Sequence, residues 1–226
     1  MKLFTELLFD FFLPRFCSGC NKKLTAGEKP ICSECLNSIL IADEDRIRSE
    51  FNRKFLSRDL IKEFYSHFVF EKDKILQDII HSLKYKKQFR TGIYLGEILS
   101  EGIKARNWQI DLILPIPLHH LKKAERGFNQ SDFIAKGLSR RLKIPYSTNS
   151  IKRIRFTESQ TNLDIEERQA NVAKAFRLRS PNKIAGKTIL LVDDVITTGA
   201  TILECGKVLV SAGVKSVYAC SIAIAD

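Results

Sequence analysis

The chain has 226 residues, 44% of them hydrophobic, which is enough for one sizeable packed domain and a second, small unit. It contains no run of about twenty apolar residues, so we expect no transmembrane helix and no integral membrane protein. Its 37 Lys and Arg residues against 26 Asp and Glu give a net charge of +11, a balance that attracts polyanions and nucleic acid in particular.

Residues 1–15 predict an amphipathic N-terminal helix. Six apolar residues recur there at helical spacing: Leu3, Phe4, Leu7, Leu8, Phe11 and Phe12. Because acidic residues interrupt the stretch and no small-residue cleavage site follows, we expect no signal peptide and a cytoplasmic protein. We expect the apolar stripe to pack on the rest of the protein. A docking face for a partner or a membrane surface is the alternative.

Four cysteines in residues 16–41 form two C-x2-C pairs. Cys17 and Cys20 make the first pair, and Cys32 and Cys35 make the second after a gap of eleven residues. Each pair can present two thiolates to one tetrahedral zinc ion, and without a secretory context disulfides are disfavoured. Because four cysteine ligands leave no open position for water, the spacing predicts a structural zinc ribbon.

The rest of the chain divides into a polar stretch at 42–62, which predicts a linker that can be partly helical, and a domain at 63–226. In that domain the pattern predicts strands at 64–70, 111–118, 144–155, 188–196 and 217–225. Helices are expected at 73–85, at 92–104, after Arg126-Gly127 and from Ala200 onward. Strands that alternate with helices predict an α/β domain with a parallel sheet.

A basic loop is expected after the strand at 111–118. It carries Lys122, Lys123 and Arg126 and ends at a helix N-terminus, which is a suitable place for pyrophosphate. His119 and His120 are candidates for acid–base chemistry, although loop histidines are more often solvated bystanders. The long polar segment 156–176 shows no strand pattern. Such loops are usually functional, and a surface excursion with two helical turns is the alternative of equal weight.

Two adjacent acids follow the buried strand at 188–196. Asp193 and Asp194 come directly after Ile189–Val192, and the polar run Thr197–Thr201 leads into a helix. Ligands collect at the carboxyl edge of open α/β sheets, and a helix N-terminus with Gly199 lets the backbone approach a phosphate. The acids have the wrong sign for a phosphate, but they suit ribose hydroxyls or a hydrated divalent cation. The stretch therefore predicts a pocket for a phosphorylated sugar.

Residues 189–201 resemble the phosphoribosyl pyrophosphate (PRPP) motif of type I phosphoribosyltransferases. The segments "SLKYKKQFR", "LPIPLHHLKKAERGFNQSDFIAKGL" and 153–176, together with the cysteine ribbon, resemble the ComF/GntX family of competence-associated, phosphoribosyltransferase-like proteins. This resemblance covers nearly the whole chain. It implies a type I phosphoribosyltransferase fold with a central, mainly parallel sheet flanked by helices, and a small N-terminal zinc ribbon with four cysteine ligands.

The resemblance also implies roles for individual residues. Asp193 and Asp194 would hold the ribose hydroxyls of PRPP, with Mg²⁺ accompanying the ligand. The 5-phosphate loop would consist of Thr197, Thr198, Gly199, Ala200 and Thr201. The pyrophosphate loop would include Leu118, His119, Arg126 and Gly127. A flexible hood over the reacting centre would contribute Gln160, Arg168 and Asn171.

Basic clusters recur along the chain and are candidates for contacts with single-stranded DNA: Lys84, Lys86, Lys87, Arg90, Lys122, Lys123, Arg153 and Arg155. On charge alone, a lysine-rich solvated surface is equally good an explanation. The family resemblance implies a role in natural transformation, with the competence helicase and other recombination factors as partners. Two functions therefore stand side by side. One is a phosphoribosyltransferase with an unidentified acceptor in nucleotide or base salvage. The other is a module that binds PRPP and DNA without turnover.

Overall fold

The computed structural model describes residues 14–25, 27–72, 74–156 and 173–225. The expected N-terminal stripe and the expected hood contacts Gln160, Arg168 and Asn171 lie outside the described residues. In the part of the chain that is described, no helix has both the length and the apolar character that a bilayer crossing requires.

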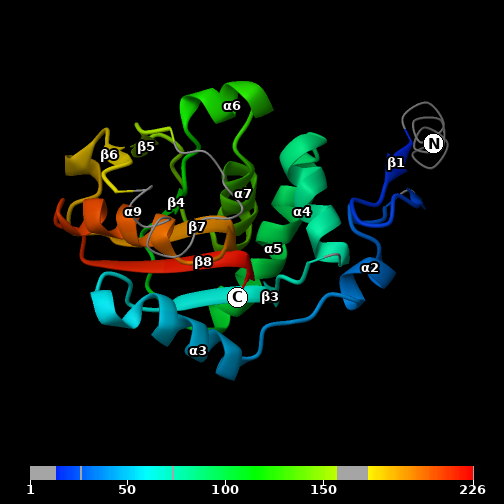
Figure 1. Cartoon of the computed structure of the whole chain (residues 1–226), viewed down its shortest axis with the longest axis horizontal. Helices are drawn as coiled ribbons and strands as arrows, with labels where there is room; N and C mark the ends of the chain where they lie inside the picture. The colour runs from blue at the N-terminus through cyan, green and yellow to red at the C-terminus, as the bar shows by residue number, and fades with distance from the viewer. Residues whose placement is uncertain (1–13, 26, 73, 157–172, 226) are drawn as a thin grey trace.

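A four-stranded parallel sheet forms the centre of the protein (Figure 1). Its strand order is β3 (Phe64–Val69), β8 (Ser216–Ile224), β7 (Thr188–Ile196) and β4 (Leu112–Pro115). The two central strands are almost entirely buried, because helices cover both faces of the sheet. The parallel sheet predicted from the alternation of strands and helices is therefore confirmed.

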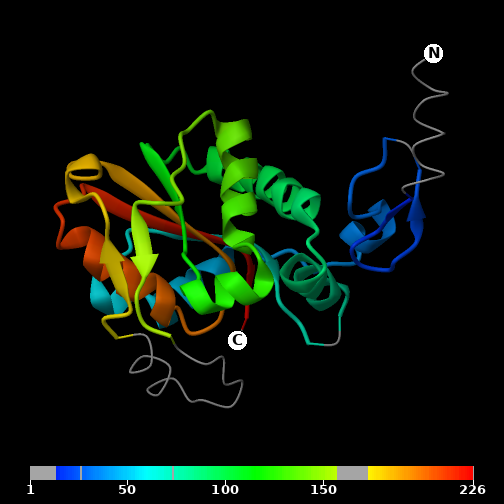
Figure 2. The same cartoon turned by 90° about the horizontal axis from the view of Figure 1, so that it is seen from above.

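Two helices pack on one face of this sheet and two on the other (Figure 2). The first pair is α5 (Phe89–Ala105) and α7 (Gln130–Leu142), and the second is α3 (Glu44–Lys54) and α9 (Ala200–Val210). The first pair lies unusually close together, since a Cβ added at Gly96 would be 2.1 Å from the Ile134 carbonyl oxygen, and one at Gly137 would be 2.1 Å from that of Ile93. This close approach fixes the N-terminus of α7 beside β7.

The cysteine unit is small and lies at one end of the molecule. It consists of the antiparallel strands β1 (Arg15–Phe16) and β2 (Lys23–Leu24) and the short helix α2 (Ser33–Asn37). Its first knuckle contacts α5 and α4 (Ile75–Tyr85). The Ser18 Oγ lies 2.6 Å from the Thr91 Oγ1 in a buried hydrogen bond, and a Cβ on Gly19 would be 2.9 Å from the Ile75 side chain. The ribbon is thus docked on the two helices.

Three stretches differ from the sequence expectation. The loop expected after β4 contains a helix, α6 (His120–Arg126). The strand expected at 144–155 is only β5 (Ile151–Arg153), and it pairs antiparallel with β6 (Phe176–Leu178) outside the central sheet. A short 3-10 turn, η2 (Pro181–Lys183), precedes β7. The stretch 42–62 contains α3 and another 3-10 turn, η1 (Leu56–Arg58). Because Phe55 at the end of α3 is fully buried, 42–62 packs as part of the domain.

Candidate functional site

The two acids lie near the carboxyl end of β7, and the backbone around them folds onto their side chains. The Asp194 N–H donates to the Asp193 Oδ1 over 2.9 Å, and the Val195 N–H donates to the Asp194 Oδ1 over the same distance. The strand continues past them to Ile196, so the turn begins at Thr197. The other oxygen of Asp194, Oδ2, faces side chains of α4 and α7.

Lys84 of α4 forms an ion pair with one of the two acids. Its Nζ lies 2.8 Å from the Asp194 Oδ2, in an ion pair whose side chains are 25% and 6% exposed. The Gln130 Nε2 lies 3.4 Å from the same oxygen, and the Ser131 Oγ donates to the Asp193 Oδ1 over 3.1 Å. Sequence reasoning grouped Lys84 with the candidates for DNA contact, but its side chain points into the acid pair. No local pattern signals this pairing.

Burial and charge set the protonation of this cluster. Burial raises the pKa of Asp193 to about 8, and the neighbouring Asp194 carboxylate adds to the shift. Burial also works to raise the pKa of Asp194, but Lys84 beside it holds this pKa below its ordinary value. The pKa of Lys84 is raised by the same pair despite its desolvation. Carboxylate oxygens accept hydrogen bonds from hydroxyl groups, which is what a ribose diol offers, and Asp193 is the more accessible of the two acids because it is half-buried whereas Asp194 is buried.

The phosphate loop follows the acids and opens α9. Gly199 has φ +74°, a conformation that suits glycine, and its carbonyl accepts the first helical hydrogen bond from Leu203 over 2.9 Å. The Ala200 N–H donates to the Thr198 Oγ1 over 3.4 Å. Thr197 is exposed, and Thr198 and Thr201 are half-buried. The loop therefore combines reachable hydroxyl groups with the positive end of a helix of 11 residues, a combination that suits a phosphate.

The segment predicted to hold pyrophosphate is a helix with its basic end turned toward the site. Arg126 ends α6, lies 5.1 Å above the Tyr85 ring and donates to the Gln130 Oε1 over 3.1 Å. Gly127 terminates the helix with φ +81°. Because Gln130 also approaches Asp194, a chain of contacts connects Arg126 to the acid pair.

His119 caps the N-terminus of α6 and is 4% exposed, so the sequence-based view of a solvated histidine is wrong. Its Nδ1 accepts from the Leu121 N–H over 3.4 Å, and its ring packs edge-on against Phe156 at 5.3 Å. Burial, with the charges around it, lowers its pKa. These contacts give His119 a structural role in α6. His120 is exposed.

A pocket of about 370 Å³ lies between α6, the start of α7 and the β5–β6 hairpin. Leu118, the remaining residue predicted for the pyrophosphate loop, lines it. Its wall also contains Lys123, Asp132, Lys152, Arg153 and Arg179. The excess of basic residues suits an anionic group.

The four ribbon cysteines lie together as a zinc site requires. Their Sγ atoms are all within 4.8 Å of one another, and those of Cys20 and Cys32 are 3.9 Å apart. Zn–S bonds of about 2.3 Å in a tetrahedron separate sulfurs by about 3.8 Å. Burial opposes ionisation of Cys17, but backbone N–H groups lower its pKa to about 7, and the Cys32 N–H lies 3.3 Å from its sulfur. These residues can hold a metal ion, and thiolate ligands favour zinc.

The remaining basic candidates fall into two groups. Lys86, Lys87 and Arg90 are exposed where α4 meets α5, next to the Tyr85 ring, which is 56% exposed. The others lie around α6 and the β5–β6 hairpin. Lys122 approaches the Phe156 ring at 5.7 Å, half-buried Arg153 lies 5.4 Å from the Phe176 ring, and exposed Arg155 donates to the Ala173 carbonyl. Lys123 is exposed and pairs with Asp132 at 3.8 Å.

Comparison with known proteins identifies the domain that contains the acids and the loop. The phosphoribosyl transferase domain family matches residues 126–225, a range that contains the acids and the phosphate loop. Adenine phosphoribosyltransferase from Thermoanaerobacter pseudethanolicus is 17% identical to this chain, with 62% of this chain and 83% of that one covered and a TM-score of 0.38. The sheet, the acid pair and the family match define a protein with a type I phosphoribosyltransferase fold.

Whole-chain relatives identify the family. Competence protein F of Haemophilus influenzae is 30% identical over 89% of this chain and 86% of its own length, and competence protein ComFC of Streptococcus pneumoniae is 27% identical over 89% and 84%. DNA utilization protein YhgH of Escherichia coli is 35% identical over 63% of this chain, and the match spans 64% of that protein. The chain belongs to the competence protein F/ComFC family, as its motifs suggest.

Proposed function

We propose that this protein binds PRPP, or a related phosphorylated ribose, at the carboxyl edge of β7, and that it binds single-stranded DNA on its basic surface during DNA uptake. The acid pair followed directly by the Gly199 turn and the N-terminus of α9 carries the first part of the proposal. Asp193 and Asp194 accept from the ribose hydroxyls, and the loop from Thr197 to Thr201 holds the 5-phosphate. Arg126 faces the pyrophosphate group.

Mg²⁺ accompanies the ligand in this proposal, because carboxylate oxygens and phosphates are the ligands that this ion prefers. The acid pair supplies such oxygens, and bound Mg²⁺ would offset the charge of the pyrophosphate. In the cysteine unit, Cys17, Cys20, Cys32 and Cys35 hold a structural zinc ion. The reduced thiols that this site needs agree with a cytoplasmic location.

The DNA-binding part rests on charge and on the names of the relatives. Lys86, Lys87 and Arg90 form an exposed basic strip beside Tyr85, and basic side chains next to an exposed aromatic ring suit a single strand. A helicase and recombination factors of the transformation machinery are the partners that this role implies. An active phosphoribosyltransferase in base salvage is the second candidate, and the complete PRPP motif favours it.

Calorimetric titration tests ligand binding directly. Wild-type protein loaded with zinc is titrated with PRPP, with and without Mg²⁺, next to the variant D193N/D194N and the control D78N, which alters an exposed acid on α4. We expect Mg²⁺-dependent binding that only D193N/D194N abolishes, with circular dichroism unchanged. Retained affinity in D193N/D194N would show that the ligand binds elsewhere. Release of pyrophosphate in the presence of free bases would favour the salvage enzyme.

DNA binding is tested with an oligothymidine at several salt concentrations. The variant K86Q/K87Q/R90Q is compared with K187Q/K215Q, whose exposed lysines lie at the amino ends of β7 and β8, at the opposite edge of the sheet. We expect affinity to fall steeply with salt, and the slope to become shallower in the first variant only. A flat salt response in the wild type would contradict a phosphate-dominated interface.

A further inference from the structure

The phosphate loop contains no basic residue of its own, although a sugar phosphate carries up to two negative charges. Residues 197–201 are Thr, Thr, Gly, Ala and Thr, so the loop offers only N–H groups, hydroxyls and the helix dipole. A cation close to the loop would strengthen phosphate binding there. The described residues place such cations on α3, in the stretch whose sequence predicts a linker.

The C-terminus of α3 touches the loop at its glycine. A Cβ added at Gly199 would lie 2.7 Å from the Phe55 ring and 3.3 Å from the Lys54 Cβ. Phe55 is fully buried and packs on Phe64 of β3, with 5.5 Å between the ring centroids. Two features therefore require glycine at position 199: the positive φ of this residue and the Phe55 ring packed against it. The Phe55 ring therefore limits how closely the loop backbone can approach α3.

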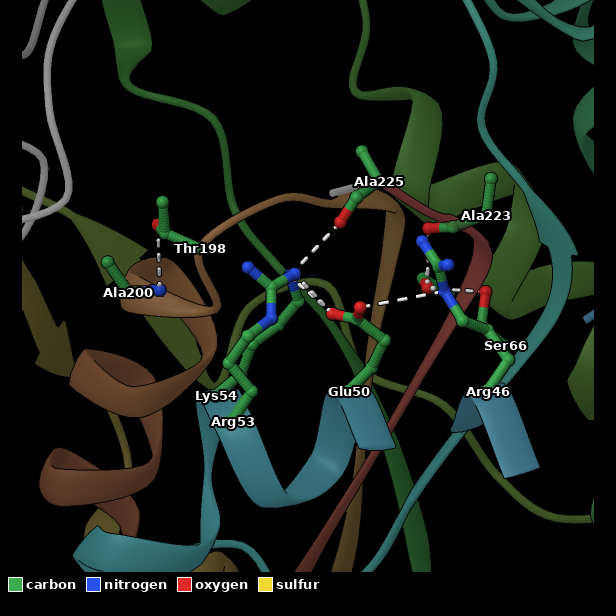
Figure 3. A network of polar contacts seen from close by, with 10 residues as sticks. Arg46, Glu50, Arg53, Lys54, Ser66, Thr198, Ala200, Ala223 and Ala225 are labelled. Carbon is green, nitrogen blue, oxygen red and sulfur yellow. Dashed lines mark hydrogen bonds and ion pairs between the residues drawn. The ribbon is translucent and has the colours of Figure 1, made fainter. Parts of the chain in front are cut away.

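Lys54 fixes the other end of the loop. Its Nζ donates to the Ala225 carbonyl over 3.0 Å, and the Ala225 N–H donates to the Ile196 carbonyl over 2.9 Å. Ile196 is the last residue of β7 before Thr197. Figure 3 shows the contacts of Lys54 with Ala225 and Glu50, with the Lys54 and Arg53 side chains reaching up from α3 beside the turn that carries Thr198. The loop is thus tied to α3 at its glycine and, through Ala225, at Ile196, the residue that precedes it.

The same face of α3 carries more positive than negative charge. Glu50 is buried and has three cationic neighbours: Arg46 at 3.5 Å, Arg53 at 2.6 Å and Lys54 at 2.8 Å. Arg53 and Lys54 bond the same carboxylate oxygen, so their charged groups lie side by side. Glu50 is therefore shared by three cations, two of which bond the same oxygen. The Lys54 side chain is 3% exposed, whereas that of Arg53 is 49% exposed and can reach a ligand.

We propose that α3 is part of the phosphate-binding site: Phe55 and Lys54 position the loop at Thr197–Thr201, and Arg53 supplies a cation for the bound phosphate. This inference rests on the proposed function, because it concerns the same loop. It assigns a binding role to residues 53–55, which precede the family match at 126–225. The tie to α3 also explains why a charged helix is packed into the domain at this point.

Titration with ribose 5-phosphate tests whether the Arg53 cation contributes to phosphate binding. R53Q removes one charge from the loop side of α3, and the matched control R48Q removes one from the opposite face of the same helix, where the side chain is 72% exposed. We expect R53Q to weaken ribose 5-phosphate binding about fivefold to tenfold, because the half-exposed Arg53 guanidinium attracts the phosphate through strong screening by water. R48Q should change it by less than about twofold, and R53K should restore most of the affinity.

The outcomes separate the two proposals. Wild-type protein that binds neither PRPP nor ribose 5-phosphate would overturn the proposed function and this inference with it. Wild-type binding with equal affinities for R53Q and R48Q would overturn the inference alone, as would an R53K variant as weak as R53Q. The double variant E50Q/K54M removes the buried pair together. Unchanged affinity in a folded E50Q/K54M protein would overturn the positioning role of Lys54.

Discussion

Replacing Lys84 with methionine tests how much the positive charge of Lys84 stabilises the acid pair. In the wild type its Nζ lies 2.8 Å from the Asp194 Oδ2, and the carboxylate side chain is only 6% exposed. Methionine has a similar length and fills the space, but it leaves the acid pair without this counter-charge. The variant should fold, and it should be less stable in a way that depends on pH.

The size of the loss follows from the burial of the pair. Removing one partner of a buried ion pair costs about 3–5 kcal/mol. The Lys84 side chain is a quarter exposed, and Gln130 stays 3.4 Å from the same oxygen, so we expect the lower value of about 2–3 kcal/mol at pH 8. For a chain of this length, that corresponds to a fall of roughly 5–10 °C in Tm.

The pH dependence has a definite sign. In the wild type, the pKa of Asp194 is below its ordinary value, so the ion pair stabilises the fold above about pH 4 and this contribution is lost as pH falls through the folded pKa. In K84M the attraction of Lys84 is lost while burial and the hydrogen bond from the Val195 N–H remain, so the pKa of Asp194 is higher than in the wild type. The folded variant then takes up a proton more readily than the folded wild type. The difference in stability between wild type and K84M should therefore shrink as pH falls from 8 to 5.

Calorimetric melting at pH 8 and pH 5 measures these differences in stability among wild type, K84M, D194N and K84M/D194N. Each variant is compared with the wild type at the same pH, so that other groups titrating between pH 8 and pH 5 do not enter the comparison. The double variant should be more stable than K84M at pH 8, because the unpaired acid is gone. Equal losses at both pH values, or a double variant no more stable than K84M, would refute the reasoning.

Three further predictions concern the loop, the DNA surface and the ribbon. G199A should destabilise the fold by about 1–3 kcal/mol and weaken ribose 5-phosphate binding, because its φ is +74° and the new Cβ meets Phe55 at 2.7 Å; unchanged melting and affinity would contradict this. Y85A should weaken oligothymidine binding about fivefold to tenfold, whereas Y146A, another exposed tyrosine, should not; equal effects would argue against stacking. Chelating the zinc should expose four thiols to a water-soluble thiol reagent and leave the two core cysteines protected until denaturant is added; six reactive thiols without denaturant would be the contrary result.

Much of the fold could be predicted from local patterns. The unbroken aliphatic run before Asp193 predicts a strand buried on both faces, and it is β7 in the middle of the sheet. The two C-x2-C pairs predict a compact cluster, and their sulfurs lie within 4.8 Å of one another. In both cases the signal is carried by neighbours in sequence, whose spacing sets the geometry directly.

Two elements could not be predicted in this way. The basic run around Lys122 lacks a long apolar stripe and suggests a loop, but the His119 cap and the Gly127 stop make it a helix. The stretch 42–62 has little apolar content, yet it contains α3. Two contacts hold it in place: buried Phe55 packs on Phe64, and the Arg106 guanidinium bonds both oxygens of exposed Glu44 at 2.6 and 2.7 Å. Such contacts depend on partners far along the chain.

The sequence by itself determined the acid pair, the phosphate loop, the cysteine cluster and the parallel α/β architecture, because each depends on residues that are close along the chain. Only the tertiary structure decided what surrounds them. Lys84 reaches Asp194 across 110 positions, and Lys54 reaches Ala225 across 171. Composition marks both lysines as surface charge. Their positions follow from tertiary packing, which brings α4 against the acids and the C-terminus of α3 against the loop at Gly199.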